Sequence, residues 1–272
     1  MSLVSAIRRR RAIRSYGSQE LTDRRLNEIE QLLDEPNKFY PDVSAKAQLV
    51  RNGRELQEDI SGILADYGKV EAPHYLVLTS EDTENGFVEL GYRYEFVVLK
   101  LTNWDIGTCW IGKGFRDEEL ARYVDIPSGQ KCCSLIAVGN LPEGKELYEI
   151  EEPKRKDLDH FLLDESTEDL SREILEILDC LRRAPSALNG QPWRVIVEEG
   201  VIHLYLKSRN KVTKMVLKNL TEMNRIDAGI GLRHLEVGGR NFWNKTEVGA
   251  ISHPEQKGVN YIGSLYSGDR EG

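Results

Sequence analysis

Three short polar side chains, Ser186, Asn189 and Gln191, lie close together in one proline-containing segment of the 272-residue chain. Their amide and hydroxyl groups suit the polar edge of a ring or a polyol chain better than bulk acid–base catalysis. The segment, residues 184–193, stops an amphipathic helix and runs into an apolar strand at residues 194–197. An ordinary helix-to-strand turn is the alternative, since Pro, Ser, Asn and Gly are common turn residues.

A second group with binding chemistry is the arginine cluster Arg10, Arg11 and Arg14. Each guanidinium is planar, stays charged and can donate two parallel hydrogen bonds, so such a cluster suits a phosphate. A helix-start residue, Thr22, follows it, and then apolar residues at three- and four-residue spacing. The alternative is a solvated basic face near a chain end, which is what most charge runs are.

The two motifs together resemble the signature of the FMN-dependent nitroreductase family. That family usually has a serine where this chain has Ala12, so one expected hydroxyl contact to the phosphate is missing. The resemblance implies an FMN phosphate site at the arginine motif and a flavin-contacting loop at residues 185–191. The residues implied for these roles are Arg10, Arg11, Ala12, Arg14, Pro185, Ser186, Asn189 and Gln191.

Two further stretches resemble the same family. Residues 106–115 match a glycine-rich strand and loop whose backbone touches the flavin, with one extra residue around Lys113. The contacts implied are those of Trp110, Ile111 and Gly112. The pair Arg155 and Lys156 resembles a basic pair that reaches the phosphate in many members, although short basic clusters are usually surface. Lys69 is another candidate cation near the flavin, for which exposed surface is the favoured interpretation.

The sequence also indicates an internal duplication. Residues 21–36 align with 170–185 at an offset of 149 (170 − 21), and residues 89–103 with 227–241 at an offset of 138 (227 − 89). Matches at a constant offset are what an internal repeat produces, although two amphipathic helices can also align by chance. The predicted halves are residues 1–157 and 158–272.

Each half keeps only one of the two motifs. Arg10 aligns with Asp159 in the second half, and Ser186 aligns with Asn37 in the first. Family members are typically intertwined homodimers with two FMN sites, and in many of them the two motifs come from different subunits. We therefore expect a fused pseudo-dimer that is monomeric, with one composite FMN site. In the other position Asp159 would repel a phosphate.

The fold expected is α+β: nitroreductase-like, with central, mostly antiparallel sheets covered by helices and two pseudo-twofold-related halves. The predicted strands are residues 75–78, 133–138, 195–197 and 203–206. Two long helices, about 88–104 and 225–243, are expected to form the central pair, with close approach at Gly91, Gly229 and Gly231. Residues 249–272 carry no recognisable pattern.

Composition excludes several classes of function. A net charge of −8 argues against nucleic-acid binding, and the sequence has no apolar run long enough to cross a membrane and no signal-peptide core. The four cysteines and five histidines show no metal-ligand spacing. Reduced thiols in the cytoplasm are the simplest expectation.

The expected function is an NAD(P)H-dependent FMN oxidoreductase that passes hydride to a small acceptor such as a nitroaromatic or a quinone. In this family the flavin carries the chemistry, so no catalytic side chain is expected. Two alternatives remain open: a dehalogenase-like or flavin-fragmenting enzyme of the same fold, and a non-catalytic flavin- or ligand-binding protein. Ala12 slightly favours the last, whereas the retained arginines favour an oxidoreductase.

Overall fold

The computed structural model describes the chain except for residues 36–37, 65–69, 113–114, 165, 209–217 and 269–272. The described part contains two four-stranded antiparallel sheets, with strand orders β1-β2-β4-β3 and β5-β6-β8-β7. The strands are β1 Ala45–Val50, β2 His74–Glu81, β3 Ile106–Ile111, β4 Gln130–Asn140, β5 Trp193–Glu198, β6 Val201–Lys207, β7 Thr246–Gly249 and β8 Val259–Ser267. The expected α+β class is therefore confirmed.

The two sheets are built in the same way. In each, the two central strands are antiparallel and have one irregularity in register, between Leu78 and Thr79 in the β2–β4 pair and between Leu204 and Tyr205 in the β6–β8 pair. A shared strand order and a shared irregularity are what two copies of one half produce. The two-half architecture is thus present, while the boundary between residues 157 and 158 stays a prediction.

Helices surround the sheets and begin where the sequence supplies capping side chains. Thr22 and Ser171 accept hydrogen bonds from the backbone N–H groups of Arg25 and Ile174 and so begin the corresponding helices α2 and α6. The α-helices are α1 Leu3–Arg9, α2 Asp23–Leu33, α3 Gly53–Leu64, α4 Glu84–Asn103, α5 Asp117–Leu120, α6 Arg172–Arg183 and α8 Lys218–Phe242. Short 3-10 helices are η2 Leu158–His160, η3 Thr167–Asp169 and η4 Ala187–Asn189.

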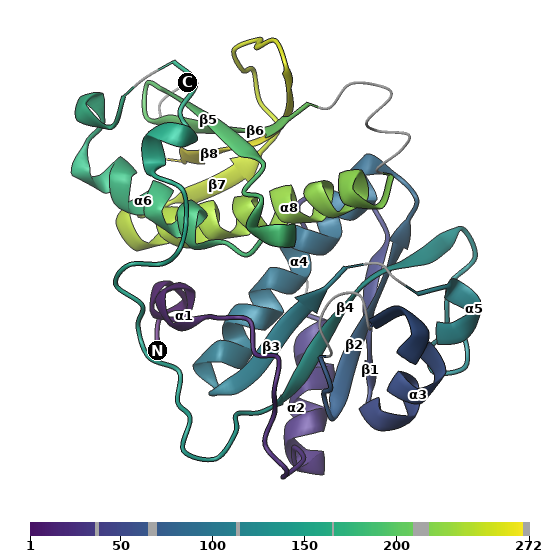
Figure 1. Cartoon of the computed structure of the whole chain (residues 1–272). Coiled ribbons are helices and arrows are strands. Elements are labelled where there is room, and N and C mark those ends of the chain that lie inside the picture. The colour runs from purple at the N-terminus through teal and green to yellow at the C-terminus, as the bar shows by residue number, and fades with distance from the viewer. Residues whose placement is uncertain (36–37, 65–69, 113–114, 165, 209–217, 269–272) are drawn as a thin grey trace.

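The long helices α4 and α8 form the centre of the molecule, with one sheet on each side (Figure 1). A Cβ added at Gly91 would lie 1.9 Å from the carbonyl oxygen of Ile226, and one at Gly229 would lie 2.0 Å from that of Val88. The two backbones can approach this closely only because both positions are glycine. Gly231, expected to share this role, instead faces Leu181 and Trp193.

Two corresponding carboxylates on this helix pair hold corresponding loops. Glu89 of α4 accepts hydrogen bonds from the backbone N–H groups of Phe39 and Tyr40, at 3.0 and 2.8 Å. Asp227 of α8 accepts from the backbone N–H of Ala187, at 3.1 Å to each oxygen. Because Glu89 and Asp227 are aligned in the repeat, these contacts support the duplication independently of the sheets.

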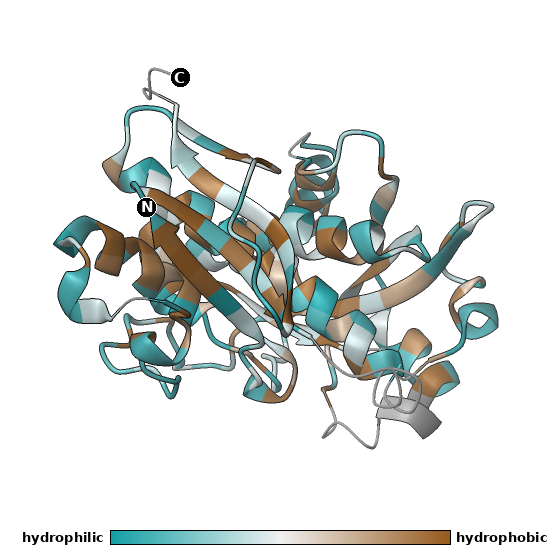
Figure 2. Ribbon diagram, turned by 90° about the horizontal axis from the view of Figure 1, so that it is seen from above, coloured by the Kyte–Doolittle hydropathy of each residue, from teal (hydrophilic) through white to brown (hydrophobic). Residues whose placement is uncertain are grey.

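Hydrophobic residues follow the strands and the inner sides of the helices, whereas the loops are polar (Figure 2). The four predicted strands lie within β2, β4, β5 and β6. The expectation for the tail was incomplete, because β8 runs through it between β6 and β7. The apolar pattern of β8 is weak partly because glycine interrupts it at position 263. A larger residue does not fit there, since a Cβ would lie 2.7 Å from the ring of Phe39.

Candidate active site

A cavity of about 860 Å³ lies between the two halves. The first half supplies the arginine segment and the end of β3, and the second supplies the loop after α6 and one side of α8. The predicted site residues that line it are Arg10, Arg11, Ala12, Arg14, Trp110, Ile111, Gly112, Arg155, Pro185, Ser186 and Asn189. Of the predicted residues that the structure describes, it thus brings together all except Lys156 and Gln191.

The arginine segment is held in place by the edge of the first sheet. After α1 ends, Ala12 forms a parallel bridge with Thr108 of β3, and the backbone N–H of Ile13 donates to the Thr108 carbonyl oxygen at 2.9 Å. The segment passes close to β3 because Gly107 has no side chain: a Cβ there would lie 3.0 Å from Ile13. Backbone pairing therefore directs the arginines of this segment to the cavity.

Three guanidinium groups in the cavity wall have unsatisfied donors. The buried Nε atoms of Arg10, Arg11 and Arg155 have no hydrogen-bond partner among the described residues. Arg10 is only 8% exposed, and its nearest carboxylate oxygen, of Glu95, lies 3.9 Å from Nε. Buried donors and buried charge are costly unless an acceptor meets them, so this wall fits an anionic ligand.

Burial also lowers the pKa of two of these groups. The pKa of Arg10 is lowered by burial, an effect that Glu95 and the Cys109 thiol partly oppose. The pKa of Arg155 falls to about 10, first because of burial and then because of repulsion from Arg10, Arg182 and Arg183. An anion placed among these groups would relieve both the burial cost and the repulsion.

The loop after α6 is bent by an unusual backbone conformation. Leu188, Asn189 and Gln191 all have positive φ, at 53, 54 and 48°, a region that is unfavourable for residues with a side chain. Asp227 holds the loop at Ala187, and Leu188 is left 78% exposed at the cavity. Such local strain is often found at binding sites, where the surrounding contacts maintain it.

Lys156 and Gln191 brace this loop instead of lining the cavity. Gln191, only 2% exposed, accepts a hydrogen bond from the backbone N–H of Lys156 and donates to the carbonyl oxygen of Asn189, both at 3.0 Å. The Lys156 ammonium donates to the carbonyl oxygen of Gly190 at 2.8 Å. Both side chains therefore act on the shape of the loop, which differs from the ligand contacts implied by the resemblance.

Part of the cavity lining is apolar. Trp110 and Ile111 at the end of β3 face it together with Met223, Ile226 and Ile230 of α8. Gly112 leaves room for Met223, because a Cβ there would lie 2.4 Å from the terminal methyl and the flexible methionine side chain would have to shift. A cavity lined by both guanidinium groups and apolar side chains suits a ligand that combines a flat apolar ring with an anionic group.

Several residues of this region were missed from the sequence alone. The α8 residues Met223, Ile226 and Ile230 had no motif, and Asp227 appeared only as the partner of Glu89 in the repeat. Asp227 is 4% exposed, and burial raises its pKa to about 8, although the Ala187 hydrogen bond opposes the shift. The repeat alignment was the available signal, since Glu89 and Asp227 perform the same task.

The loop of the first half that corresponds to the Ser186 loop is packed with aromatic side chains. Phe39 packs against Tyr92, with ring centroids 5.5 Å apart, and reaches the backbone of β8 at Gly263. The Tyr40 hydroxyl donates to the carbonyl oxygen of Ile262 at 3.5 Å. Asn37, the counterpart of Ser186, lies outside the described residues, as do Lys69 and Lys113.

The expected position of Asp159 is wrong. Its segment bridges to β5 at Leu162 and Val195, whereas Ala12 bridges to β3, and β3 and β5 are not counterparts in the two sheet orders. Asp159 accepts a hydrogen bond from the backbone N–H of Thr167 at 2.9 Å, which fixes a local turn. The alignment failed here because backbone pairing, which the offset does not encode, decides where a non-helical segment lies.

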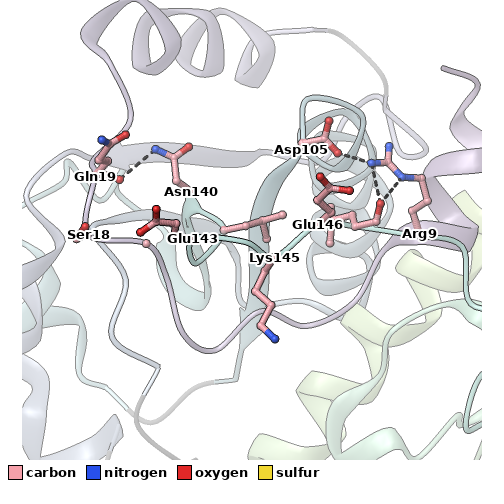
Figure 3. A pocket seen from close by; sticks show the side chains of 11 residues that line it. Arg9, Ser18, Gln19, Asp105, Asn140, Glu143, Lys145 and Glu146 are labelled. Carbon is pink, nitrogen blue, oxygen red and sulfur yellow. Dashed lines mark hydrogen bonds and ion pairs between the residues drawn. The ribbon is translucent and has the colours of Figure 1, made fainter.

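A second, polar cavity of about 780 Å³ is lined by Arg9 and by residues 17–19, which flank the arginine segment in the chain (Figure 3). The Arg9 guanidinium in this cavity already has hydrogen-bond partners, because it donates to Asp105 and to the carbonyl oxygen of Leu147. Asn140 donates to the carbonyl oxygen of Gln19 at 3.0 Å. In this cavity, Arg9 and Asn140 are thus already engaged by contacts within the chain.

The part of the chain that the structure describes contains no group of three or more His, Cys, Asp or Glu side chains arranged to hold a metal ion. Within the same residues, none of the helices has the length and apolar character needed to cross a membrane.

Comparison with known proteins identifies relatives of the whole chain. Residues 2–239 match the sequence profile of a family described as "Putative TM nitroreductase". The crystal structure of a "putative nitroreductase" from Thermotoga maritima MSB8 is similar over 97% of this chain and 93% of its own, with 23% identity and a TM-score of 0.64. No curated protein matches the sequence.

Shorter nitroreductases match part of the chain. One from Bacteroides fragilis, solved with bound FMN, is 21% identical over 57% of this chain and 96% of its own, with a TM-score of 0.45. Another with bound FMN, from Desulfitobacterium hafniense, is 17% identical over 58% of this chain and 98% of its own, with a TM-score of 0.47.

Proposed function

The chain belongs to the "Putative TM nitroreductase" family, and from this premise we propose that it is an FMN-dependent oxidoreductase. In this proposal it takes hydride from NAD(P)H and passes it to a small acceptor such as a nitroaromatic or a quinone. The observation that carries the proposal is the cavity between the halves, whose lining combines apolar side chains with three arginines whose Nε atoms have no hydrogen-bond partner among the described residues. A phosphate and a flat ring fit these two kinds of lining.

Different residues of the cavity would bind different parts of FMN. Arg10, Arg11 and Arg155 would hold the phosphate, with Arg14, which is exposed at the same cavity, as a further cation. The apolar wall at Trp110 would lie against the ring. When bound, FMN would supply the hydride chemistry, so the chain has to bind it, orient it and stabilise negative charge near it.

The polar loop would contact the edge of the ring or the ribityl chain. Ser186 and Asn189 line the cavity, and each can offer a hydrogen-bonding group there. Lys156 and Gln191 would contribute indirectly by fixing the loop, as their contacts with the loop backbone indicate. The proposed cofactor set is therefore FMN, with NAD(P)H as cosubstrate, and the fixed groups of the chain orient both.

One composite site per chain follows from the same geometry. The arginine segment comes from the predicted half 1–157 and the polar loop from 158–272, and the counterpart loop is packed by Phe39 and Tyr40. One chain thus supplies both sides of the site, which supports a monomeric pseudo-dimer. The four free cysteines are buried, which suits a reducing compartment such as the cytoplasm.

The decisive experiment is reconstitution with excess FMN, desalting and measurement of flavin absorption per chain. About one flavin per chain, followed by oxidation of NADH or NADPH with a nitroaromatic or quinone acceptor, is the expected result. No retained flavin would overturn the proposal, and two per chain would overturn the single composite site.

A non-catalytic flavin-binding protein is the second candidate function. Ala12 favours it, because the family's usual hydroxyl is missing from a residue that lines the cavity. The two functions differ in one measurement: a non-catalytic protein would retain FMN but would not oxidise NAD(P)H faster than free FMN does.

A further inference from the structure

Behind the arginine wall lies a buried pair of titratable side chains, Glu95 of α4 and His234 of α8, both fully buried. His234 Nε2 lies 2.9 Å from Glu95 Oε1, and the Trp110 indole N–H donates to Glu95 Oε2 at 2.7 Å. Arg10 Nε is 3.9 Å from Glu95 Oε1. The carboxyl group therefore contacts the arginine segment, the apolar wall and the other half of the molecule at once.

Hydrogen-bond chemistry determines how many protons this pair holds. His234 Nδ1 lies 2.8 Å from the carbonyl oxygen of Cys180, which can only accept, so Nδ1 carries a hydrogen. The contact between Nε2 and Glu95 Oε1 then needs one more hydrogen, on either the ring or the carboxyl group. In both arrangements the pair shares one proton and has no net charge.

This proton count matters for Arg10. A lone Glu95 carboxylate would neutralise Arg10 and make the cavity less attractive to an anion. Since His234 already neutralises Glu95, the positive charge of Arg10 stays available on the cavity side. Two other titratable groups lie close to Arg10. The Cys109 thiol adds no negative charge, because burial raises its pKa, and Arg155 is itself a cation.

We propose that His234 is a positioning residue that cancels the charge of Glu95 and thereby leaves Arg10 free to bind the anionic group of the cavity ligand. The proposal rests on the proposed FMN site, and it adds a contribution from the far side of the helix pair. Removing the imidazole while keeping Glu95 leaves a buried negative charge beside Arg10, which is the opposite of what a phosphate site needs.

The test is FMN affinity, measured by flavin fluorescence between pH 5.5 and 8.5, for wild type, His234→Gln, Glu95→Gln and the double variant. We expect His234→Gln to weaken binding by roughly tenfold at pH 8 and to recover as the lone carboxylate takes up a proton on acidification. The double variant, again neutral, should bind to within about threefold of wild type. A purely structural role would give neither the pH dependence nor the recovery.

Glu95→Gln keeps the test decisive even if His234→Gln does not fold. Its amide can accept from Trp110 and donate to a neutral His234, so the charge beside Arg10 stays the same and FMN affinity should change less than threefold. If Glu95 were instead a simple counter-ion of Arg10, this variant would bind FMN about tenfold more tightly. That outcome, or a His234→Gln affinity without pH dependence, would overturn the inference.

Failure of the proposed function would look different. If wild type binds no FMN, the flavin proposal is wrong, and the same variants are then compared by their thermal stabilisation with inorganic phosphate. Weaker stabilisation of His234→Gln than of the double variant would uphold the charge argument for an anion other than FMN. Equal stabilisation of all four proteins would refute it.

Discussion

At the scale of single residues, the site is defined by arginines whose buried Nε atoms have no hydrogen-bond partner among the described residues. Arg155 shows this most clearly: it lines the cavity, its only described hydrogen bond is to the carbonyl oxygen of Lys154, and its buried Nε has no partner. Its pKa of about 10 shows that the folded chain disfavours its charge as long as no anion is present. A bound phosphate would remove that penalty.

We expect Arg155→Ala to weaken FMN binding by roughly ten- to a hundredfold, which corresponds to the loss of a charged hydrogen bond of about 1.5–3 kcal/mol. Fluorescence titration of reconstituted protein measures this. Arg122→Ala is the control, because that side chain is 73% exposed and pairs with Asp59 away from the cavity. Equal affinities of the two variants would remove Arg155 from the site.

A substitution at Ala12 tests the site by a gain, not a loss, of FMN affinity. We expect Ala12→Ser to strengthen FMN binding about threefold to tenfold, since one neutral hydrogen bond contributes about 0.5–1.5 kcal/mol. Ser15→Ala, at an exposed position outside the cavity lining, should leave the dissociation constant unchanged. An unchanged affinity of Ala12→Ser would show that the phosphate does not lie at this position.

At the scale of elements, the loop after α6 depends on α8. Its positive-φ residues are held by Asp227 and by the hydrogen bonds of Gln191, so the loop keeps its bend only while those contacts persist. This arrangement requires the carboxyl group of Asp227 to be buried. The local sequence, including the proline after α6, predicts a turn here, but it does not predict that α8 supports the turn.

We expect Asp227→Asn to alter the pH dependence of stability. Because burial raises the pKa of Asp227 from 3.8 to about 8, the folded chain keeps a proton that the unfolded chain releases. This group's contribution to stability is therefore complete below pH 3.8 and is lost as the pH rises to about 8. The melting temperature of Asp227→Asn, relative to wild type, should rise from pH 5 to pH 8 and then level off.

The control for that experiment is the exposed residue Asp34, whose Asn variant should follow wild type at every pH. Burial also raises the pKa of Glu89, but this effect is common to all three proteins and cancels in the differences. A constant difference between Asp227→Asn and wild type across the pH range would mean that Asp227 is not a buried acid.

The helix pair α4–α8 gives a prediction about packing. An alanine at Gly229 would put its Cβ 2.0 Å from the Val88 carbonyl oxygen and 2.7 Å from the Tyr92 nitrogen, so the backbones must separate. We expect Gly229→Ala to cost about 3 kcal/mol and to lower the melting temperature by roughly 5–10 °C. Lys100→Ala on α4 should lower it far less, and similar losses for the two would contradict the close approach.

At the scale of the whole molecule, the two halves have diverged around one cavity. The sheets keep one strand order and the helix pair keeps corresponding carboxylates, but the arginine segment lies on one half and the polar loop on the other. Glu95 and His234 join the halves directly behind the site. A single chain therefore contains the complete interface.

We expect the reconstituted protein to be monomeric, with the mass of 31.0 kDa that one chain has. Light scattering coupled to size-exclusion chromatography measures this directly, and the same sample gives the flavin content. A dimer with one flavin per two chains would show that the site is not complete within one chain.

The sequence alone was sufficient for features that depend on local patterns. The spacing of apolar residues located α2 and α6, the repeat and the long helix-like stretches located α4 and α8, and short apolar runs located four strands. The motifs at Arg10 and Ser186 identified residues that line one cavity, because each motif is a short continuous stretch of chain. The constant offset of the repeat indicated the duplicated architecture.

Only the tertiary structure decided which groups remain free and which are used in packing. Gln191 and Lys156 look like ligand contacts in sequence but brace a loop, and Asp159 lies on a different sheet edge from the one that its alignment suggested. The Glu95–His234 pair lies 139 residues apart in the chain and becomes visible only once α4 and α8 are packed. Pairing between distant segments sets such positions, and a local sequence pattern does not record it.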